Sequence, residues 1–246
     1  MLSVIIITKN EAQNIRRCLE SVSFADEIIV VDSGSSDTTV SIAHEFTSKV
    51  FIMTDWQGYG IQKQRALEKA TGDWVLNLDA DESLSEALQR DIQKAIATDK
   101  ADAYRIPIQM CFYGKPLRYS SSPQRHIRLF KRAGAKYRDV IVHENIELPT
   151  TFRIAQLQNS IQHSSFRDVS HALTKTNQYS SYSAKIRIEK NQSSSFFKSI
   201  AAGVWMFLRC YLLQRGFLDG QAGFLMACFN AQGSFYKGIK QIYRDD

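Results

Sequence analysis

Short apolar runs alternate with amphipathic stretches over the first hundred residues of the chain. Four runs predict β-strands, at Leu2–Thr8, Glu27–Val31, Lys49–Met53 and Asp73–Leu78. The stretches between them carry apolar residues at helical spacing and predict helices at Ile15–Val22, with Asn10 as the expected cap, and at Thr38–Phe46, Ile61–Ala70 and Ser85–Ala97. This alternation favours an α/β protein with a mostly parallel sheet and helices on both of its faces.

The pattern changes after residue 100. Short apolar segments predict strands at Ala103–Gln109, Ile127–Lys131, Val140–Val142 and Ile154–Gln162. Helical spacing then dominates, over Val169–Lys190, Phe196–Gln214 and Leu218–Tyr243. We therefore expect a sheet-based domain over residues 1–168, with halves at 1–100 and 101–168, and a helical C-terminal region over residues 169–246.

Polar residues follow three of the predicted strands at the point where each strand ends. They are Thr8–Glu11, Asp32–Gly34 and Asp79–Asp81. In open α/β sheets, ligands bind beyond the carboxyl ends of the strands, so these segments predict a binding site. Packing alone does not account for carboxylates at three strand ends.

Asp79 and Asp81 leave one strand with a single small residue between them. Oxygen ligands of this kind select Mg²⁺ or Mn²⁺, which commonly bridges a protein carboxylate and a substrate phosphate. The alternative is a turn that caps the helix predicted at Ser85–Ala97.

Two further groups of residues suit a nucleotide ligand. Asp32 is placed to accept hydrogen bonds from a base or a ribose, and Gly34 lets the loop approach a ligand closely. Lys63 and Arg65 open a predicted helix and are expected to meet phosphate groups there. An ordinary helix-capping loop and a solvated helix face are the alternatives.

Charge is distributed unevenly along the 246 residues. Residues 1–100 hold 10 Lys and Arg against 16 Asp and Glu, whereas residues 101–246 hold 21 against 9. The basic half indicates either a polyanionic partner or simply a solvated surface. Four distant cysteines exclude a disulfide scaffold and a zinc site built on a C-x-x-C pair.

The segment Phe196–Gln214 combines apolar side chains with Trp205, Lys198 and Arg209. This composition suits a helix lying in a membrane interface, and equally a helix packed on the catalytic domain. Its uninterrupted apolar run, Ile200–Leu208, is shorter than the roughly 20 residues of a spanning helix. The N-terminus also lacks the basic segment of a signal peptide, so we expect a protein without membrane spans.

Several segments together resemble family 2 glycosyltransferases. They are Ser3–Glu11, Val30–Thr38, Gln62–Leu67 and Asn77–Glu82. Three later segments narrow the likeness to bacterial lipopolysaccharide-core glucosyltransferases acting on inner-core heptose: Val142–Glu144, Gln162–Phe166 and Arg215–Gly220. Gln64 departs from the pattern, which has Asn after the basic residue.

The resemblance implies the GT-A fold and an inverting transfer of a hexose, with glucose as the best guess, from a UDP-sugar to a lipopolysaccharide inner-core acceptor. It implies Glu144 as the base that deprotonates the acceptor, chosen over Asp139 and Glu147, and a divalent metal, Mg²⁺ or Mn²⁺, held by Asp81 and His163. The implied nucleotide-sugar contacts come from Thr8, Asn10, Glu11, Asp32, Gly34, Lys63, Arg65, Asp79 and Ala80.

A lipid-linked saccharide acceptor further implies a cytoplasmic enzyme, peripheral on the inner face of the bacterial inner membrane and touching anionic lipid. No nucleic-acid partner is expected. The alternatives are a family 2 transferase for another glycan or lipid acceptor, and a non-catalytic protein that binds polyanions or membranes. The acidic strand ends argue against the last, since a polyanion binder needs no such cluster.

Overall fold

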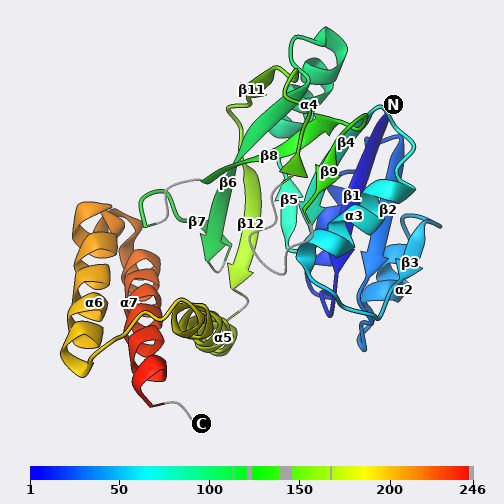
Figure 1. Ribbon diagram of the computed structural model, residues 1–246. Helices are drawn as coiled ribbons and strands as arrows, with labels where there is room; N and C mark the ends of the chain where they lie inside the picture. The colour runs from blue at the N-terminus through cyan, green and yellow to red at the C-terminus, as the bar shows by residue number, and fades with distance from the viewer. Residues whose placement is uncertain (113, 121–123, 139–145, 167, 244–246) are drawn as a thin grey trace. The chain divides into compact units, whose positions relative to one another are not determined.

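The computed structural model describes residues 1–112, 114–120, 124–138, 146–166 and 168–243 (Figure 1). The chain divides into two units. One, the sheet unit, comprises residues 1–108 and 124–163, and the other, the helical unit, comprises residues 109–123 and 164–246. The division falls a few residues before the boundary expected at residue 168 and also assigns residues 109–123 to the helical unit.

The strands of the main sheet follow the order β3-β2-β1-β4-β8-β6-β12-β5. Its parallel part consists of β3 (Val50–Ile52), β2 (Glu27–Asp32), β1 (Leu2–Thr8) and β4 (Trp74–Asp79). The other strands are β8 (Gln124–Lys131), β6 (Ala103–Phe112), β12 (Ile161–Phe166), β5 (Glu82–Leu84), β7 (Lys115–Pro116) and β11 (Ile154–Gln156). Strand β8 is antiparallel to both β4 and β6. The predicted α/β class is confirmed.

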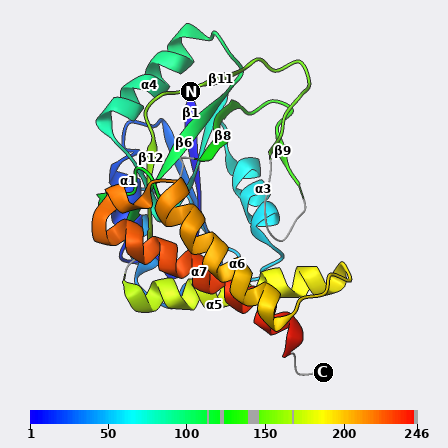
Figure 2. The same cartoon turned by 90° about the vertical axis from the view of Figure 1, so that its left-hand side faces the viewer.

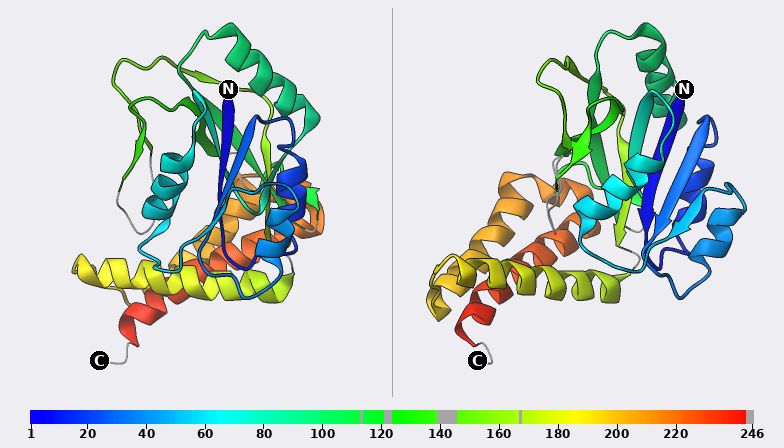
Figure 3. Two further views of the ribbon diagram at one scale, coloured as in Figure 1. Left: turned by 90° about the vertical axis from the view of Figure 1, so that its right-hand side faces the viewer. Right: turned by 45° about the vertical axis from the view of Figure 1, so that its right-hand side comes forward.

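Helices cover both faces of the parallel part because β1 is apolar in both directions. Val4 and Ile6 point to one face, where they pack with α1 (Ile15–Glu20), α2 (Thr39–His44) and α4 (Glu86–Thr98). Ile5 and Ile7 point to the other face and pack with α3 (Tyr59–Lys69). Figure 3 shows α3 on one side of the sheet and α1 and α4 on the other. A sheet buried on both faces leaves only its strand ends for a polar site.

Two local expectations were wrong. Asn10 does not cap the first helix, which begins at Ile15; Asn10 instead adopts a left-handed conformation, with φ of 55°, and its side chain accepts a hydrogen bond from Ser36 N. The single strand expected over 154–162 is divided into β11 and β12. A second small sheet pairs β9 (Lys136–Tyr137) with β10 (Ile146–Glu147). The strand expected at Val140–Val142 lies outside the described residues.

The helical unit contains α5 (Val169–Glu189), α6 (Phe196–Leu208) and α7 (Gly220–Ile242). Helix α7 packs against both α5 and α6 (Figure 2). Small residues allow α6 and α7 to approach closely, since a Cβ atom at Gly238 would lie 2.2 Å from the Ser199 hydroxyl. An apolar cluster within the unit includes Phe112, Met226 and Phe229.

Helix α6 accounts for most of the helix predicted over Phe196–Gln214. It continues through a π-helical turn, η1 (Arg209–Leu213), and a 3₁₀ turn, η2 (Gly216–Asp219), precedes α7. By length and composition alone, the 18 residues Phe196–Leu213 form a helix that is apolar enough to cross a membrane, and most of their surface is exposed. The expected absence of such a helix is therefore not upheld on this criterion.

Candidate functional site

The strand register brings the polar strand ends of the sheet unit to one edge. Strand β1 lies between β2 and β4, with Thr8 opposite Asp32 on one side and Ile7 opposite Asp79 on the other. Two carboxylates therefore flank the end of β1, as the sequence predicted. The loop that follows each strand adds its polar groups to the same edge.

Asp79 ends β4 between two cations. Its Oδ1 lies 2.9 Å from Lys63 Nζ, and its Oδ2 accepts a hydrogen bond of 3.1 Å from Arg128 Nη2. Burial alone would raise the pKa of Asp79, but Lys63 and Arg128 outweigh it and hold that pKa well below its ordinary value. Asp79 is thus a fixed anion that orients two cations at the strand end.

Arg128 also joins Asp79 to Glu82. The same Nη2 atom donates a hydrogen bond of 2.7 Å to Glu82 Oε1, and Glu82 Oε2 accepts from the Asp79 backbone N–H at 2.9 Å. Burial, and the nearby charge of Asp79, raise the pKa of Glu82 to about 7 although Arg128 opposes them. These bonds close the turn after β4 and fix the direction in which Asp81 leaves it.

Asp81 and His163 meet across this turn. Strand β12 pairs with β5 so that His163 lies opposite Glu82, and His163 Nε2 lies 3.0 Å from Asp81 Oδ2. Burial would lower the pKa of His163, but the hydrogen bond and charge of Asp81 raise it overall. The structure therefore brings together two residues that are 82 positions apart and that the family resemblance paired as metal ligands.

The donor set at Asp81 and His163 fits a divalent metal that is shared with a ligand. A carboxylate oxygen beside an imidazole nitrogen suits Mn²⁺ as well as Mg²⁺. No group of three or more His, Cys, Asp or Glu residues suited to a metal occurs within the described ranges. A metal here would take its remaining ligands from phosphate oxygens and water, and binding would displace any proton on His163.

The loop after β2 is held by Asp32. This fully buried carboxylate accepts hydrogen bonds from the backbone of Gly34 at 2.9 Å and of Ser35 at 2.7 Å, and from the Ser35 hydroxyl. Gly34 has φ of 84°, which favours glycine. Asp32 therefore shapes the loop, and most of its acceptor sites are already used.

The loop after β1 is hydrogen-bonded to the segment that follows β2. Asn10 N donates to the Ser35 hydroxyl, and Glu11 N donates to the Thr39 hydroxyl, each at 2.8 Å. The Thr8 hydroxyl is buried and lacks a hydrogen-bond partner among the described residues. An unpaired buried hydroxyl at a strand end is a ready donor for a ligand.

Helix α3, which packs on the face of the sheet that carries Ile5 and Ile7, contributes three polar side chains to the same edge. Gln62 is fully buried; its amide donates to the Ser33 hydroxyl at 2.8 Å and its oxygen accepts from Arg65 at 2.8 Å. Arg65 forms a two-point ion pair with Asp55. Lys63 thus faces the strand end through Asp79, whereas Arg65 is engaged by the loop before α3.

Among the described residues, the structure does not bring the side chains of the remaining expected or alternative site residues to this strand edge. Ala80 is buried in the apolar core, so only its backbone is available to a ligand. Glu144 and Asp139 lie outside the described residues. Glu147 is exposed and paired with Arg138 at 2.7 Å. The choice of Glu144 as the base therefore stays a prediction.

Sequence reasoning missed Arg128, Glu82 and Gln62 as parts of the site. Arg128 carried a signal, because it is a charged residue in the otherwise apolar segment Ile127–Phe130 and is only 7% exposed. Buried arginine is rare unless it is paired. No pattern in the sequence identified its partners, since Asp79 and Glu82 lie on two other strands, β4 and β5.

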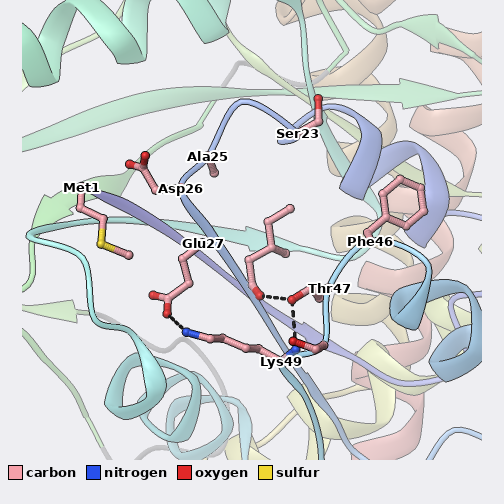
Figure 4. A pocket seen from close by; sticks show the side chains of 10 residues that line it. Met1, Ser23, Ala25, Asp26, Glu27, Phe46, Thr47 and Lys49 are labelled. Carbon is pink, nitrogen blue, oxygen red and sulfur yellow. Dashed lines mark hydrogen bonds and ion pairs between the residues drawn. The ribbon is translucent and has the colours of Figure 1, made fainter.

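A pocket at the opposite ends of these strands has a structural explanation (Figure 4). Glu27 lies in its wall and accepts hydrogen bonds from Lys49, from the Ser3 hydroxyl and from Thr71. Burial would raise the pKa of Glu27, but these bonds outweigh it and lower that pKa to about 2. They tie β1, β2 and the chain before β4 together, and we assign no ligand to this pocket.

Comparison with known families covers most of the sheet unit. The family model described as "Glycosyl transferase family 2" matches residues 3–157. That range contains the strand ends and loops described above, apart from His163.

Two relatives match nearly the whole chain. A lipopolysaccharide core biosynthesis glycosyltransferase, LpsC of Rhizobium meliloti, is 31% identical over 99% of this chain and 92% of its own length. A Rickettsia typhi protein called an uncharacterized glycosyltransferase is 33% identical over 97% of this chain and 86% of its own.

A solved structure supports the fold. That of Staphylococcus aureus TarS, residues 1–349, has a TM-score of 0.51 at 16% identity, covering 96% of this chain and 91% of that one. The same TarS fragment has been solved in complex with UDP-GlcNAc. The likeness supports the GT-A fold expected from the sequence.

Proposed function

Because this chain belongs to glycosyl transferase family 2 and is a glycosyltransferase, we propose that it moves a hexose, glucose in the first instance, from a UDP-sugar to a lipopolysaccharide inner-core acceptor. The observation that carries the proposal is the cluster of Asp79, Asp81 and His163 at the end of β4. Likeness to LpsC along 99% of the chain supports the acceptor class.

Residues of the sheet unit would stabilise the negative charge of the departing nucleoside diphosphate. Lys63 is held by Asp79 at the strand end, where its positive charge favours a diphosphate. Asp81 and His163 would hold a divalent metal, which when bound neutralises charge on the departing nucleoside diphosphate. The loops of Asn10 and Asp32 would receive the uridine, with the Thr8 hydroxyl as a further donor.

A base must deprotonate the acceptor hydroxyl, which then attacks the anomeric carbon on the face opposite the leaving group. The transition state resembles an oxocarbenium ion, as in glycoside hydrolysis. We assign the base to Glu144, on the resemblance of Val142–Glu144 to the family motif. Inversion at the anomeric carbon follows from this single displacement.

We further propose a cytoplasmic enzyme that contacts the inner face of the bacterial inner membrane. The exposed apolar side chains of α6, among them Phe197, Val204 and Trp205, support a membrane contact. A lipid-linked acceptor gives that contact a purpose, since the enzyme then works where its acceptor is found.

The direct test supplies purified protein with a panel of UDP-sugars and with lipopolysaccharide truncated after its inner core, in Mn²⁺, in Mg²⁺ and in excess chelator. We expect transfer with UDP-glucose and a requirement for metal. Transfer of a different sugar would correct the donor. Transfer only to another lipid-linked glycan would correct the acceptor, and full activity in chelator would remove the metal.

A further inference from the structure

The helical unit contains a pocket of about 250 Å³ between α5 and α7, reached also by Met206 of α6. The apolar part of its lining, here called its floor, consists of Phe166, Met206, Met226 and Phe229. Lys175 and Lys237 stand among its walls, with Asn230 and several hydroxyl groups. All of these residues belong to the helical unit.

The charge of Lys237 has no acidic partner among the residues that the structure describes. Within the part of the chain that the structure describes, no carboxylate forms an ion pair with Lys237 or with its neighbour Arg187. Burial lowers the pKa of Lys237, and the positive charge of Arg187 lowers it further. The charge of an anion placed in the pocket would offset both effects.

The whole helical unit also carries an excess of positive charge. Residues 109–123 and 164–246 hold 13 Lys and Arg against 5 Asp and Glu. The close contact of Gly238 with Ser199 places the Lys237 turn of α7 beside the first turn of α6. That turn of α6 carries Phe197, which is 82% exposed. Lys237 and the exposed Phe197 therefore lie toward the same end of the α6–α7 pair.

We propose that this pocket binds the headgroup of an anionic phospholipid, with the phosphate at Lys237 and Lys175 and the first methylenes of the acyl chains over the apolar floor. The volume suits a headgroup and a few methylenes, and is small for an entire lipid. A phosphate accepts charge-assisted hydrogen bonds from lysine. The proposal rests on the membrane contact proposed above and gives it a specific site.

The test measures binding of short-chain phosphatidylglycerol, below its micelle concentration, to the full-length protein by calorimetry. Lys237→Gln is expected to weaken binding at least about tenfold, the usual loss for a charged hydrogen bond. Lys185→Gln is the matched control, since it removes the same charge from an exposed position on α5 outside the pocket and is expected to change affinity less than about twofold.

A second variant leaves every charge in place. A Cβ atom at Gly233, in the pocket wall, would meet only Thr176 Cγ2 at 3.6 Å, an ordinary contact. Gly233→Val, with folding checked by circular dichroism, is expected to abolish binding by filling the pocket. Unchanged affinity in a folded Gly233→Val variant would overturn the proposal.

Two further ligands identify the chemistry. Inorganic phosphate is expected to bind at least about tenfold more weakly, because it lacks the acyl chains, and short-chain phosphatidylcholine more weakly than phosphatidylglycerol. Equal binding of phosphate, equal binding of phosphatidylcholine, or equal losses in Lys237→Gln and Lys185→Gln would each overturn the headgroup site. Vesicle binding through α6, and sugar transfer, are measured separately, so they can persist when this site fails.

Discussion

The sheet unit and the helical unit differ in whether their cations are paired with carboxylates and in whether their apolar side chains are buried. In the sheet unit, buried cations such as Lys63 and Arg128 are matched to carboxylates, and β1 is enclosed on both faces. In the helical unit, Lys237 has no carboxylate partner among the described residues, and α6 exposes Phe197 and Trp205. Exposed apolar groups next to an unbalanced cation are typical of a surface that meets a partner.

The largest effect is expected at Asp81. Asp81→Ala should abolish transfer, with a fall of at least about 10³-fold, because it removes a ligand that stabilises the leaving diphosphate. The fold should persist, as judged by circular dichroism. Asp73→Ala is the matched control, since Asp73 precedes the same strand at its other end and is exposed. Full activity in Asp81→Ala would remove the metal mechanism.

Glu144→Gln keeps the size of the side chain and loses the proton acceptor. Turnover should fall by about 10²–10⁴, the usual contribution of a general base, while affinity for the donor is unchanged. Glu147→Gln, which removes an exposed carboxylate paired with Arg138, serves as the control. Normal turnover in Glu144→Gln together with an inactive Asp139→Asn would transfer the role to Asp139.

Arg128 tests whether matched charges hold the sheet unit together. Arg128→Met should lower the free energy of unfolding by about 3–5 kcal/mol, because it removes the cation that pairs with both Asp79 and Glu82 in a buried site. Urea denaturation measures this loss. Adding Glu82→Gln should recover part of it, since the unpaired charge is then gone. Additive losses in the double variant would show that the two residues are not coupled.

Glu27 gives the sheet unit a dependence on pH. Its folded pKa of about 2 lies below the ordinary value of 4.5. Its contribution is therefore complete above pH 4.5 and is lost as the pH falls towards 2. Glu27→Gln should cost about 2 kcal/mol at pH 7 from lost hydrogen bonds, and its stability should converge with that of the wild type in acid. A difference that stays constant with pH would contradict this assignment.

The smallest effect is expected on vesicle binding. Val204→Ser with Trp205→Ala removes two exposed apolar groups from α6, and sedimentation with anionic vesicles should weaken by about tenfold. Binding should weaken in high salt without vanishing, because apolar insertion does not depend on charge. Unchanged sedimentation of the folded variant would show that α6 serves only the helical unit itself.

The sequence predicted the parallel half of the sheet well, because β1, β2 and β4 are apolar runs that end in polar segments. It also predicted that Asp79 and Asp32 share an edge, which follows from parallel pairing. It did not predict the pairing of Arg128, whose partners Asp79 and Glu82 lie on two other strands. Asn10 was misjudged because its contacts come from the next loop, which local capping rules do not include.

The central claim, that this site transfers a sugar to lipopolysaccharide, is tested most directly in cells. The lipopolysaccharide of a strain lacking the protein is analysed by mass spectrometry, and the strain is then complemented with the wild type or with Asp81→Ala. We expect the deletion to lose a hexose from the inner core, the wild type to restore it and Asp81→Ala to fail at equal protein level. An unchanged lipopolysaccharide in the deletion strain, or full restoration by Asp81→Ala, would contradict the claim.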